Sequence, residues 1–469
     1  MASRVPLLLG LSDDLLTSIL ALLDQETKCR VLPLVCSRFR RLLQQPGSWQ
    51  EVTFTERRMA ALAEELRLRL FLAWAHRISR GLRQLKVDVP ADLDDEANAV
   101  LLTDLSSVLG QAAPSLQLLE LKCRYSLDAQ RVLPPLLQSQ LRALTELHLL
   151  AEDRIQGLQL ASLSSLQRLN IVVDGEPPES LDAESTLPPS ITWLGLTPAP
   201  LVAEPGAVGI FSKAIPPCVC ALPRLEFLDI SESRGLTGLH TALRQLTLLT
   251  GLALDHAGLA DLPKAMTGLQ HLRLLSLHGT FSWDDGDEEM MQPVGLSALA
   301  PLKELRVLSI SESFRLTALP PAVVGLTRLK ALHLEKCPSL EGLPDNLLLP
   351  HLLMLSIDWP ILFASHAVVA RQPKLQQLLL GSMQSAVQNL FVPATQARAD
   401  IAAVEASLQR CTALATLSVI VYAGPDSGLT MDAASLMLRL PRTCPVLQLQ
   451  PLDAFSFFLT DSEQLAEGD

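Results

Sequence analysis

The stretch that decides the fold is "LRVLSISESFRLTALPPAVVGLTRLKALHL", from Leu305 to Leu334. It opens and closes on one pattern, which is Leu, two variable residues, Leu, one variable residue, then Ile or Leu. The alternation around the central leucines, Leu308 and Leu332, predicts short strands with one apolar face. Between them, Pro320 opens a return segment, where the missing N–H of proline costs little. One copy is therefore a strand followed by a return.

This pattern recurs along most of the chain, usually at intervals of 22 to 28 residues. The central leucines are Leu85, Leu119, Leu147, Leu169, Leu194, Leu228, Leu252, Leu275, Leu308, Leu332, Leu355, Leu378 and Leu417, with a fainter copy at Leu447. One copy is too small to bury its own leucines, so neighbouring copies must stack in parallel and bury them together. The sequence therefore predicts an α/β solenoid whose strands line the concave side.

Over residues 82 to 450 the chain resembles the leucine-rich repeat family. That family often places Asn five residues after the central leucine, where its side chain bonds to the backbone of the turn. Here the position holds Asp174, Ser233, Thr280, Ser313 and Cys337 in five of the copies. The resemblance therefore implies the family's curved solenoid with a less regular ladder in its turns.

A different kind of segment precedes the repeats. Leucines and Ile19 recur at helical spacing after Ser12, Asp13 and Asp14, which supply a helix cap and a favourable charge for the helix dipole. A second apolar set, Val31, Leu34, Val35, Phe39 and Leu42, alternates with four arginines, and Pro46 and Trp49 follow. The pattern predicts a small bundle of amphipathic helices, which we call the head.

The head also resembles the F-box, a motif that docks substrate receptors onto the Skp-type adaptor of cullin-RING ubiquitin ligases. The matching blocks are "LSDDLL", "LVCSRFRRL" and "PGSW", in the family's order. The chain departs from the motif at Ser12, at Phe39 and by one extra residue between Asp24 and Cys36. The resemblance implies adaptor contacts by Leu11, Leu15, Leu16, Ile19, Leu20, Leu23, Val35, Cys36, Phe39, Leu42, Pro46 and Trp49.

These patterns divide the chain into four segments. The helical head spans 1–54, a linking helix 55–81, the repeats 82–452 and a tail 453–469. In the linking helix, Leu66, Leu70, Trp74 and Ile78 recur every four residues and predict the face that packs on the first repeat. The helix is expected to cap the edge of the solenoid.

Polar residues flank the central leucines in the second half of the repeats. Strand side chains alternate between core and surface, so these residues are expected to face solvent as an acidic stripe. We predict that it binds a substrate protein, and the alternative is an ordinary solvated face. The predicted contacts are Asp229, Asp255, His278, Ser311, His333, Glu335 and Asp358. The acidic insertion from Phe281 to Pro293 is either a docking arm or a solvated loop.

Composition and charge exclude several classes of protein. The net charge is −12, with +5 on residues 1–90 and −17 on the remainder, which argues against nucleic-acid binding. No apolar stretch is long enough for a membrane span, and eight Cys without a pairing pattern favour a reducing compartment. We expect a cytoplasmic or nuclear location. Cys218 and Cys220 lack the partners of a zinc site, so neither metal nor cofactor is predicted.

The sequence also lacks a P-loop, a GxSxG or HExxH motif and a recognisable catalytic constellation, so we expect no enzyme activity. The two resemblances together imply a substrate receptor of a cullin-RING ligase. In that role the head would bind the adaptor and the repeats a substrate protein. The alternatives are a leucine-rich repeat scaffold whose head merely caps the solenoid, and a receptor with a small-molecule pocket.

Overall fold

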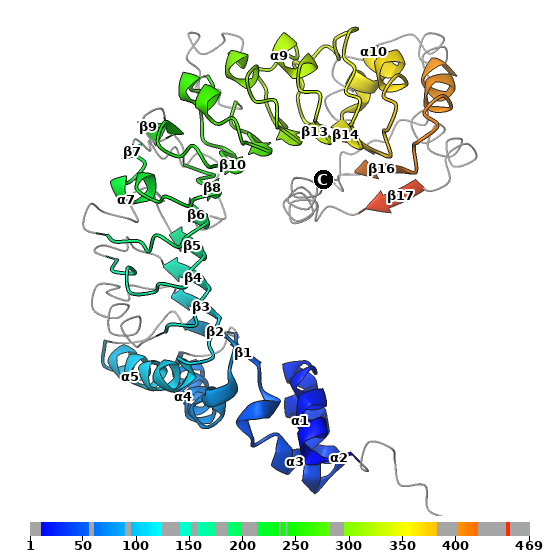
Figure 1. Cartoon of the computed structure of the whole chain (residues 1–469). Coiled ribbons are helices and arrows are strands. Elements are labelled where there is room, and N and C mark those ends of the chain that lie inside the picture. The colour runs from blue at the N-terminus through cyan, green and yellow to red at the C-terminus, as the bar shows by residue number, and fades with distance from the viewer. Residues whose placement is uncertain are drawn as a thin grey trace, which may run out of the picture. The chain divides into compact units, whose positions relative to one another are not determined.

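The computed structural model of the chain forms two compact units (Figure 1). Unit 1 comprises Met1–Ala207 and Pro216–Leu225, and unit 2 comprises Val208–Ile215 and Glu226–Asp469. The structure describes residues 11–55, 61–89, 95–123, 141–151, 158–173, 185–198, 213–233, 236–237, 239, 243–259, 261–281, 295–381, 402–420 and 447–450. The acidic insertion after Phe281 and the tail 453–469 lie outside these residues.

The head consists of short helices in unit 1. They are α1 (Asp13–Ala21), the π-helical η2 (Thr27–Val31), α2 (Leu32–Val35), α3 (Ser37–Leu42) and the 3-10 turn η3 (Pro46–Ser48). Ser12 caps α1, because its hydroxyl accepts a hydrogen bond from the Leu15 N–H at 3.3 Å. At α3 the Cys36 sulfur plays the same part and accepts from the Phe39 N–H at 3.4 Å. Helix α1 therefore begins where the sequence predicts, whereas the cap of α3 by Cys36 was not predicted.

The core of the head is closed by Trp49. Its indole is only 2% exposed and donates to the Leu43 carbonyl at 2.7 Å. The ammonium of Lys28 lies 5.2 Å from the centre of a Trp49 ring and donates to the Ala21 carbonyl at 3.0 Å. Burial lowers the pKa of Lys28, and the nearby carboxylates of Asp24 and Glu51 oppose that effect.

Six parallel strands of unit 1 follow one another in chain order. They are β1 (Glu51–Phe54), β2 (Gln84–Val89), β3 (Leu118–Cys123), β4 (Glu146–Ala151), β5 (Arg168–Val173) and β6 (Trp193–Pro198). The central leucines from Leu85 to Leu194 are in register and fully buried. The sheet begins at β1, inside the segment that was predicted to be all helical. Residues 51–54 pair with β2 because Val52 and Phe54 continue the alternation of buried side chains.

Helices α4 (Ala61–Ile78) and α5 (Asp95–Ala112) belong to unit 1, with η4 (Ser79–Gly81) and the short α7 (Pro217–Cys220). The predicted packing face of α4 is wrong at two positions, since Leu66 and Leu70 are 59% and 63% exposed. The buried face instead carries Leu68, Leu72, Ala75 and Ile78. These residues follow helical spacing too, and the contacts of α4 with α5 select that face.

Nine parallel strands of unit 2 are also stacked in chain order. They are β8 (Phe227–Asp229), β10 (Gly251–Ala253), β11 (Leu274–Ser276), β12 (Val307–Ser309), β13 (Ala331–Leu334), β14 (Met354–Ile357), β15 (Gln377–Leu380), β16 (Thr416–Ile420) and β17 (Leu447–Gln450). Each central leucine pairs with the next in the register. The predicted parallel stack is confirmed.

The return segments of unit 2 lie on the opposite side from the strands (Figure 1). They include η6 (Lys264–Gly268), η8 (Ser297–Leu299), α9 (Pro321–Val324) and α10 (Trp359–Val369), and β7 (Lys213–Ala214) pairs with β9 (Leu236–Thr237) to the side. Pro263 and Pro320 stand at the N-caps of η6 and α9, as the sequence predicts. Among the described helices of the chain, none is long and apolar enough to cross a bilayer.

A left-handed residue follows the strand in five successive repeats of unit 2. Four residues after the central leucine the backbone φ angles are positive, at Glu232 (62°), His256 (52°), Gly279 (63°), Glu312 (55°) and Lys336 (58°). The N–H groups of the first four donate to carbonyls of the next repeat at 2.6 to 2.9 Å. This ladder offsets the cost of the left-handed conformation, about 1 kcal/mol for a residue other than glycine.

The next position in each turn is the one that holds Asn in the resembled family. Two of the residues that stand in place of Asn form hydrogen bonds with the backbone of the preceding repeat. Thr280 donates to the Leu254 carbonyl at 2.5 Å, and Cys337 donates to the Ile310 carbonyl at 3.3 Å. The hydroxyls of Ser233 and Ser313 have no hydrogen-bond partner among the described residues. The ladder is therefore irregular, as predicted. Asp174 lies outside the described residues.

Candidate functional site

The head presents an exposed apolar surface. Of the twelve large apolar side chains that are exposed in the described residues, six lie between positions 15 and 35. They are Leu15 (56%), Ile19 (37%), Leu22 (83%), Val31 (53%), Leu34 (80%) and Val35 (60%). Leu15, Ile19 and Leu22 follow one face of α1, while Leu16 and Leu20 on another face are buried. An apolar surface of this kind marks an interaction site. We call these six side chains the head surface.

The structure places the predicted adaptor contacts in three environments. Leu15, Ile19 and Val35 are exposed; Leu11, Leu23 and Cys36 are half-buried; Leu16, Leu20, Phe39, Leu42 and Trp49 are buried in the head. Pro46 opens η3, and its side chain lies outside the described residues. The buried residues shape the head, and only the exposed ones are free to touch a partner directly. Leu22, Val31 and Leu34 are exposed as well, although they are not among the predicted adaptor contacts.

A charged contact joins the two ends of the head. Arg38 Nε donates to Asp13 Oδ1 at 2.8 Å, and Arg41 lies 3.1 Å from Asp13 Oδ2. The hydrogen bond from Arg38 lowers the pKa of Asp13. Arg38 also donates to the Leu11 carbonyl at 2.6 Å, so α3 holds the start of α1 in place.

The predicted stripe on the strands of unit 2 does not face solvent along its whole length. Ser311, His333, Glu335 and Asp358 are at most 5% exposed, whereas Asp229, Asp255 and His278 are half-buried. The flanking positions of the same strands also hold an apolar cluster, which the alternation of the pattern alone does not reveal. It contains Leu274, Val307, Ala331, Met354 and Leu379, with Phe227 packed against it. The assignment of these polar residues to substrate binding stays a prediction.

The half-buried part of the stripe is a hydrogen-bonded chain. Asp229 Oδ1 accepts from the Ser231 N–H at 3.0 Å, and Ser231 Oγ accepts from the Asp255 N–H at 3.2 Å. Asp255 Oδ1 in turn accepts from Ser276 Oγ at 2.6 Å and from the His278 N–H at 2.8 Å. Burial raises the pKa of Asp229, and it raises that of Asp255 to about 6 despite the hydrogen bond from Ser276.

The deeper part of the stripe brings two carboxyl groups together. Burial, followed by the charge of Glu335, raises the pKa of Asp358 to about 7. Asp358 Oδ2 accepts from the Cys337 N–H at 3.2 Å, while Oδ1 has no hydrogen-bond partner among the described residues. Gly381 leaves room for this carboxyl, because a Cβ there would lie 2.4 Å from Asp358 Oδ1. Burial also lowers the pKa of His333.

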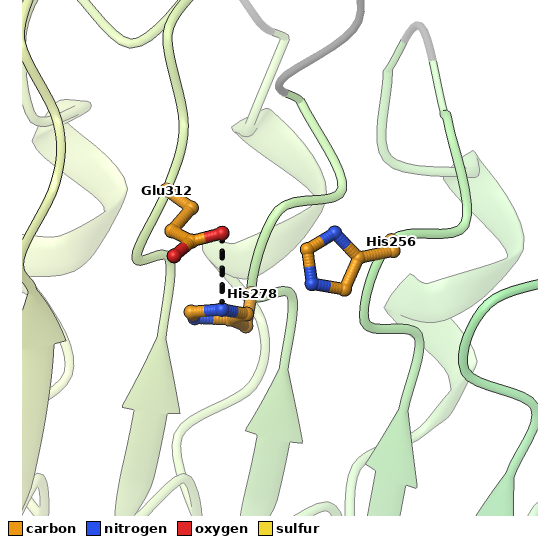
Figure 2. Close-up of side chains that lie close together, drawn as sticks. All are labelled: His256, His278 and Glu312. Atoms are coloured by element: carbon orange, nitrogen blue, oxygen red, sulfur yellow. Dashed lines mark ion pairs between the residues drawn. The ribbon is translucent and has the colours of Figure 1, made fainter. Parts of the chain in front are cut away.

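A second group of side chains gathers at the turns after β10, β11 and β12. His256, His278 and Glu312 come from three successive repeats, and Figure 2 shows them facing one another. His278 Nε2 lies 3.3 Å from Glu312 Oε2, and the rings of His256 and His278 meet edge to face with centroids 5.1 Å apart. All three are half-buried. We call these three side chains the histidine cluster.

Charge holds the histidine cluster together. Burial is the largest single effect and lowers the pKa of His278, but the hydrogen bond and charge of Glu312 together with the charges of Asp255 and Glu335 outweigh it, so the pKa is raised. The hydrogen bond from His278 lowers the pKa of Glu312 to about 2, and Lys336 pairs with the same carboxylate. Sequence reasoning predicted His278 only as a substrate contact and missed His256 and Glu312. Their common place in the repeat, three or four residues after the central leucine, was the signal that could have found them.

The comparisons with known proteins bear on the repeats. A family model described as R13L1/DRL21 leucine-rich repeats matches residues 263–359. An internalin C2 from Listeria monocytogenes is similar at 18% identity and a TM-score of 0.26, over 52% of this chain and 77% of that chain. The functional domain of InlJ from the same organism is similar at 13% identity and a TM-score of 0.30, over 66% and 70%.

No curated protein matches the chain in sequence. These two structures are below 25% identity and have TM-scores below 0.5, so neither bears on the assignment of this chain. The matched family model lies inside unit 2 and spans β11 to β14 with their returns. Together with the repeating register of parallel strands, it supports a leucine-rich repeat protein.

Proposed function

We propose that this protein is a non-catalytic substrate receptor of a cullin-RING ubiquitin ligase, in which the head binds the Skp-type adaptor and the repeats bind a substrate protein. The observation that carries the proposal is the head surface. Six exposed apolar side chains on a small, well-packed helical unit are costly in water unless a partner covers them. Because the head resembles the F-box, we propose the Skp-type adaptor as that partner.

The internal structure of the head supports this assignment. Leu16, Leu20, Phe39, Leu42 and Trp49 form a core that keeps α1 and α3 in place. Arg40 of α3 donates to the Pro33 carbonyl of α2 at 2.9 Å, so α2 is held as well and the exposed side chains are preorganised. Leu15 and Ile19 on α1 and Leu34 and Val35 on α2 then offer apolar area that a partner can remove from water. Adaptor binding therefore needs no unfolding of the head.

The repeats support the second half of the proposal. Stacked repeats form extended surfaces on which proteins bind, and in unit 2 Asp229 on β8 and Asp255 and His278 in the turns after β10 and β11 are only half-buried. A receptor of this kind acts by position: it raises the effective concentration of substrate lysines near the ubiquitin-loaded enzyme. That role requires no catalytic residue in this chain. It also implies a cytoplasmic or nuclear site of action.

The test is a pull-down of the full chain with a purified Skp-type adaptor. Leu34→Asp and Leu15→Asp place a charge on the head surface without touching the core, and each is expected to abolish capture. Leu70→Asp is the matched control, because Leu70 is similarly exposed but lies on α4 outside the head. If the wild type and the three variants are captured equally, or if the wild type is not captured, the proposal is wrong. The protein would then be a leucine-rich repeat scaffold without a ligase role.

A further inference from the structure

We propose that the histidine cluster of unit 2 is a binding site for a divalent transition-metal ion, Zn²⁺ being the best match to its donors. Two imidazoles and one carboxylate are the protein ligands of many open zinc sites, which keep a further position for water or another group. The three ligand atoms lie within 4.8 Å of one another. This proposal is independent of the ligase-receptor role, because the head takes no part in it.

The distances are close to those that a tetrahedral ion requires. Zinc–ligand bonds of about 2.0–2.2 Å place two donors about 3.4 Å apart. His278 Nε2 and Glu312 Oε2 already stand 3.3 Å apart. The third donor, a ring nitrogen of His256, lies within 4.8 Å of the other two ligand atoms. It has to move closer to them, and rotation about the side-chain bonds of His256 supplies that movement. The edge-to-face arrangement of the rings leaves their nitrogen edges near one another (Figure 2).

The backbone fixes both histidines in this arrangement. His256 occupies the left-handed position of its turn, and its N–H donates to the His278 carbonyl at 2.7 Å. In the next repeat that position holds Gly279, and a Cβ there would lie 2.1 Å from His256 Nδ1. The His278 N–H is held by Asp255 Oδ1 at 2.8 Å. The glycine therefore makes room for the first imidazole, and the aspartate orients the backbone of the second.

The charges of the cluster suit a cation. Glu312 is the carboxylate of the group, and its two oxygens face two different partners, the Lys336 ammonium at Oε1 and the His278 imidazole at Oε2. An ion bound between the histidines takes the place of the imidazole proton beside Oε2 and leaves the contact with Lys336 in place. All three side chains are half-buried, so an ion can enter from solvent. His333 and Glu335, in contrast, are almost completely buried.

Titration calorimetry of the metal-free full chain with ZnCl₂ tests the proposal. The expected result is one ion bound per chain, with binding weakened at least about tenfold by either His256→Asn or His278→Gln, since even outer-shell partners of a metal contribute that much. Asn suits position 256 because it tolerates the left-handed backbone. The matched control is His271→Gln, which removes an exposed histidine of the same unit and is expected to leave binding unchanged.

A spectrum with Co²⁺ separates this site from adventitious binding by thiols, since Cys29 is exposed and Cys218 and Cys220 lie close in sequence. The cluster contains no sulfur, so the cobalt complex should show the visible bands of a low-coordinate nitrogen and oxygen site without a thiolate charge-transfer band. Unchanged circular dichroism of the variants confirms that they fold. Absence of zinc binding in the wild type, equal binding by all variants, or a thiolate band would each overturn the proposal.

Discussion

The indole rings of Trp49 and Trp74 meet edge to face, with centroids 4.7 Å apart and ring planes at 87°. Beside them, Phe54 of β1 lies 5.1 Å from Phe71 of α4, measured between ring centroids. These four aromatic rings connect the head to the linking helix and to the first strand. The head is therefore built into the edge of the unit 1 sheet, and a loss of this contact should loosen the head.

Substitution Trp74→Leu tests that connection. It keeps an apolar side chain but removes the edge-to-face contact with Trp49, and we expect a loss of about 1 kcal/mol in the free energy of unfolding, beyond any loss of buried area. Urea unfolding followed by circular dichroism measures it. Leu70→Ala, an exposed change on the same helix, should stay within about 0.5 kcal/mol. If Trp74→Leu and Leu70→Ala lower the free energy of unfolding equally, the aromatic contact does not stabilise the head.

Two glycines should respond in opposite ways to alanine. Gly279→Ala adds a Cβ to a left-handed residue and drives it against the His256 ring, so we expect destabilisation by more than about 1 kcal/mol. Gly110→Ala adds a Cβ that meets nothing within 4 Å inside α5, so we expect stabilisation by about 0.5–1 kcal/mol. Thermal unfolding of both variants measures the difference. A stabilising Gly279→Ala would contradict the described turn.

The buried carboxyl of Asp358 should make stability depend on pH. Its pKa is raised to about 7 in the fold, against 3.8 as the ordinary value, so the unfolded state loses the proton first. The contribution of this group is therefore full below about pH 4 and declines as the pH rises towards 7. The free energy of unfolding that is lost over this pH range is at most about 4 kcal/mol, since each unit of difference between the two pKa values corresponds to about 1.4 kcal/mol.

Substitution Asp358→Asn removes this titration. The stability of the variant relative to wild type should rise between pH 4 and 7, as measured by urea unfolding at several pH values. Asp345→Asn, at an exposed position of the same unit, serves as the control and should leave the difference flat. Parallel pH profiles of wild type and Asp358→Asn would show that the carboxyl is already ionised in the fold.

Leu15 and Leu16 are neighbours in sequence and should differ in the effect of a charge. Leu16 is 1% exposed, so Leu16→Asp buries a carboxylate in the core of the head and should unfold it. Leu15 is 56% exposed, and Leu15→Asp should leave the helical circular dichroism and the Trp49 fluorescence of the head unchanged. Similar losses of structure in both variants would contradict the described orientation of α1.

The regular part of the fold could be predicted from the sequence. A leucine pattern with a fixed period leaves few alternatives, and every central leucine from Leu85 to Leu447 lies in a parallel strand. The head was predictable in part, because Ser12 and helical spacing define α1. The β1 strand was missed, since four residues that end a helical bundle carry too little pattern to separate strand from loop.

Side-chain environments were less predictable. Alternation shows which residues leave the core, but it does not show that Leu274, Val307 and Met354 form an apolar cluster on the strand face, or that His333 and Glu335 are buried. Helical spacing in α4 allowed two faces, and packing selected the one through Leu68 rather than Leu66. The histidine cluster depends on left-handed turns at His256 and Glu312, where a local sequence pattern would favour Gly or Asn.

Titration calorimetry of the full chain with a purified Skp-type adaptor gives the dissociation constant of the proposed complex. We predict saturable one-to-one binding by the wild type and by Leu70→Asp, and at least about a hundredfold weakening by Leu34→Asp, since a charge in a desolvated apolar contact costs several kcal/mol. No heat with the wild type, or equal constants for the three proteins, would contradict the proposal that the head docks on this adaptor.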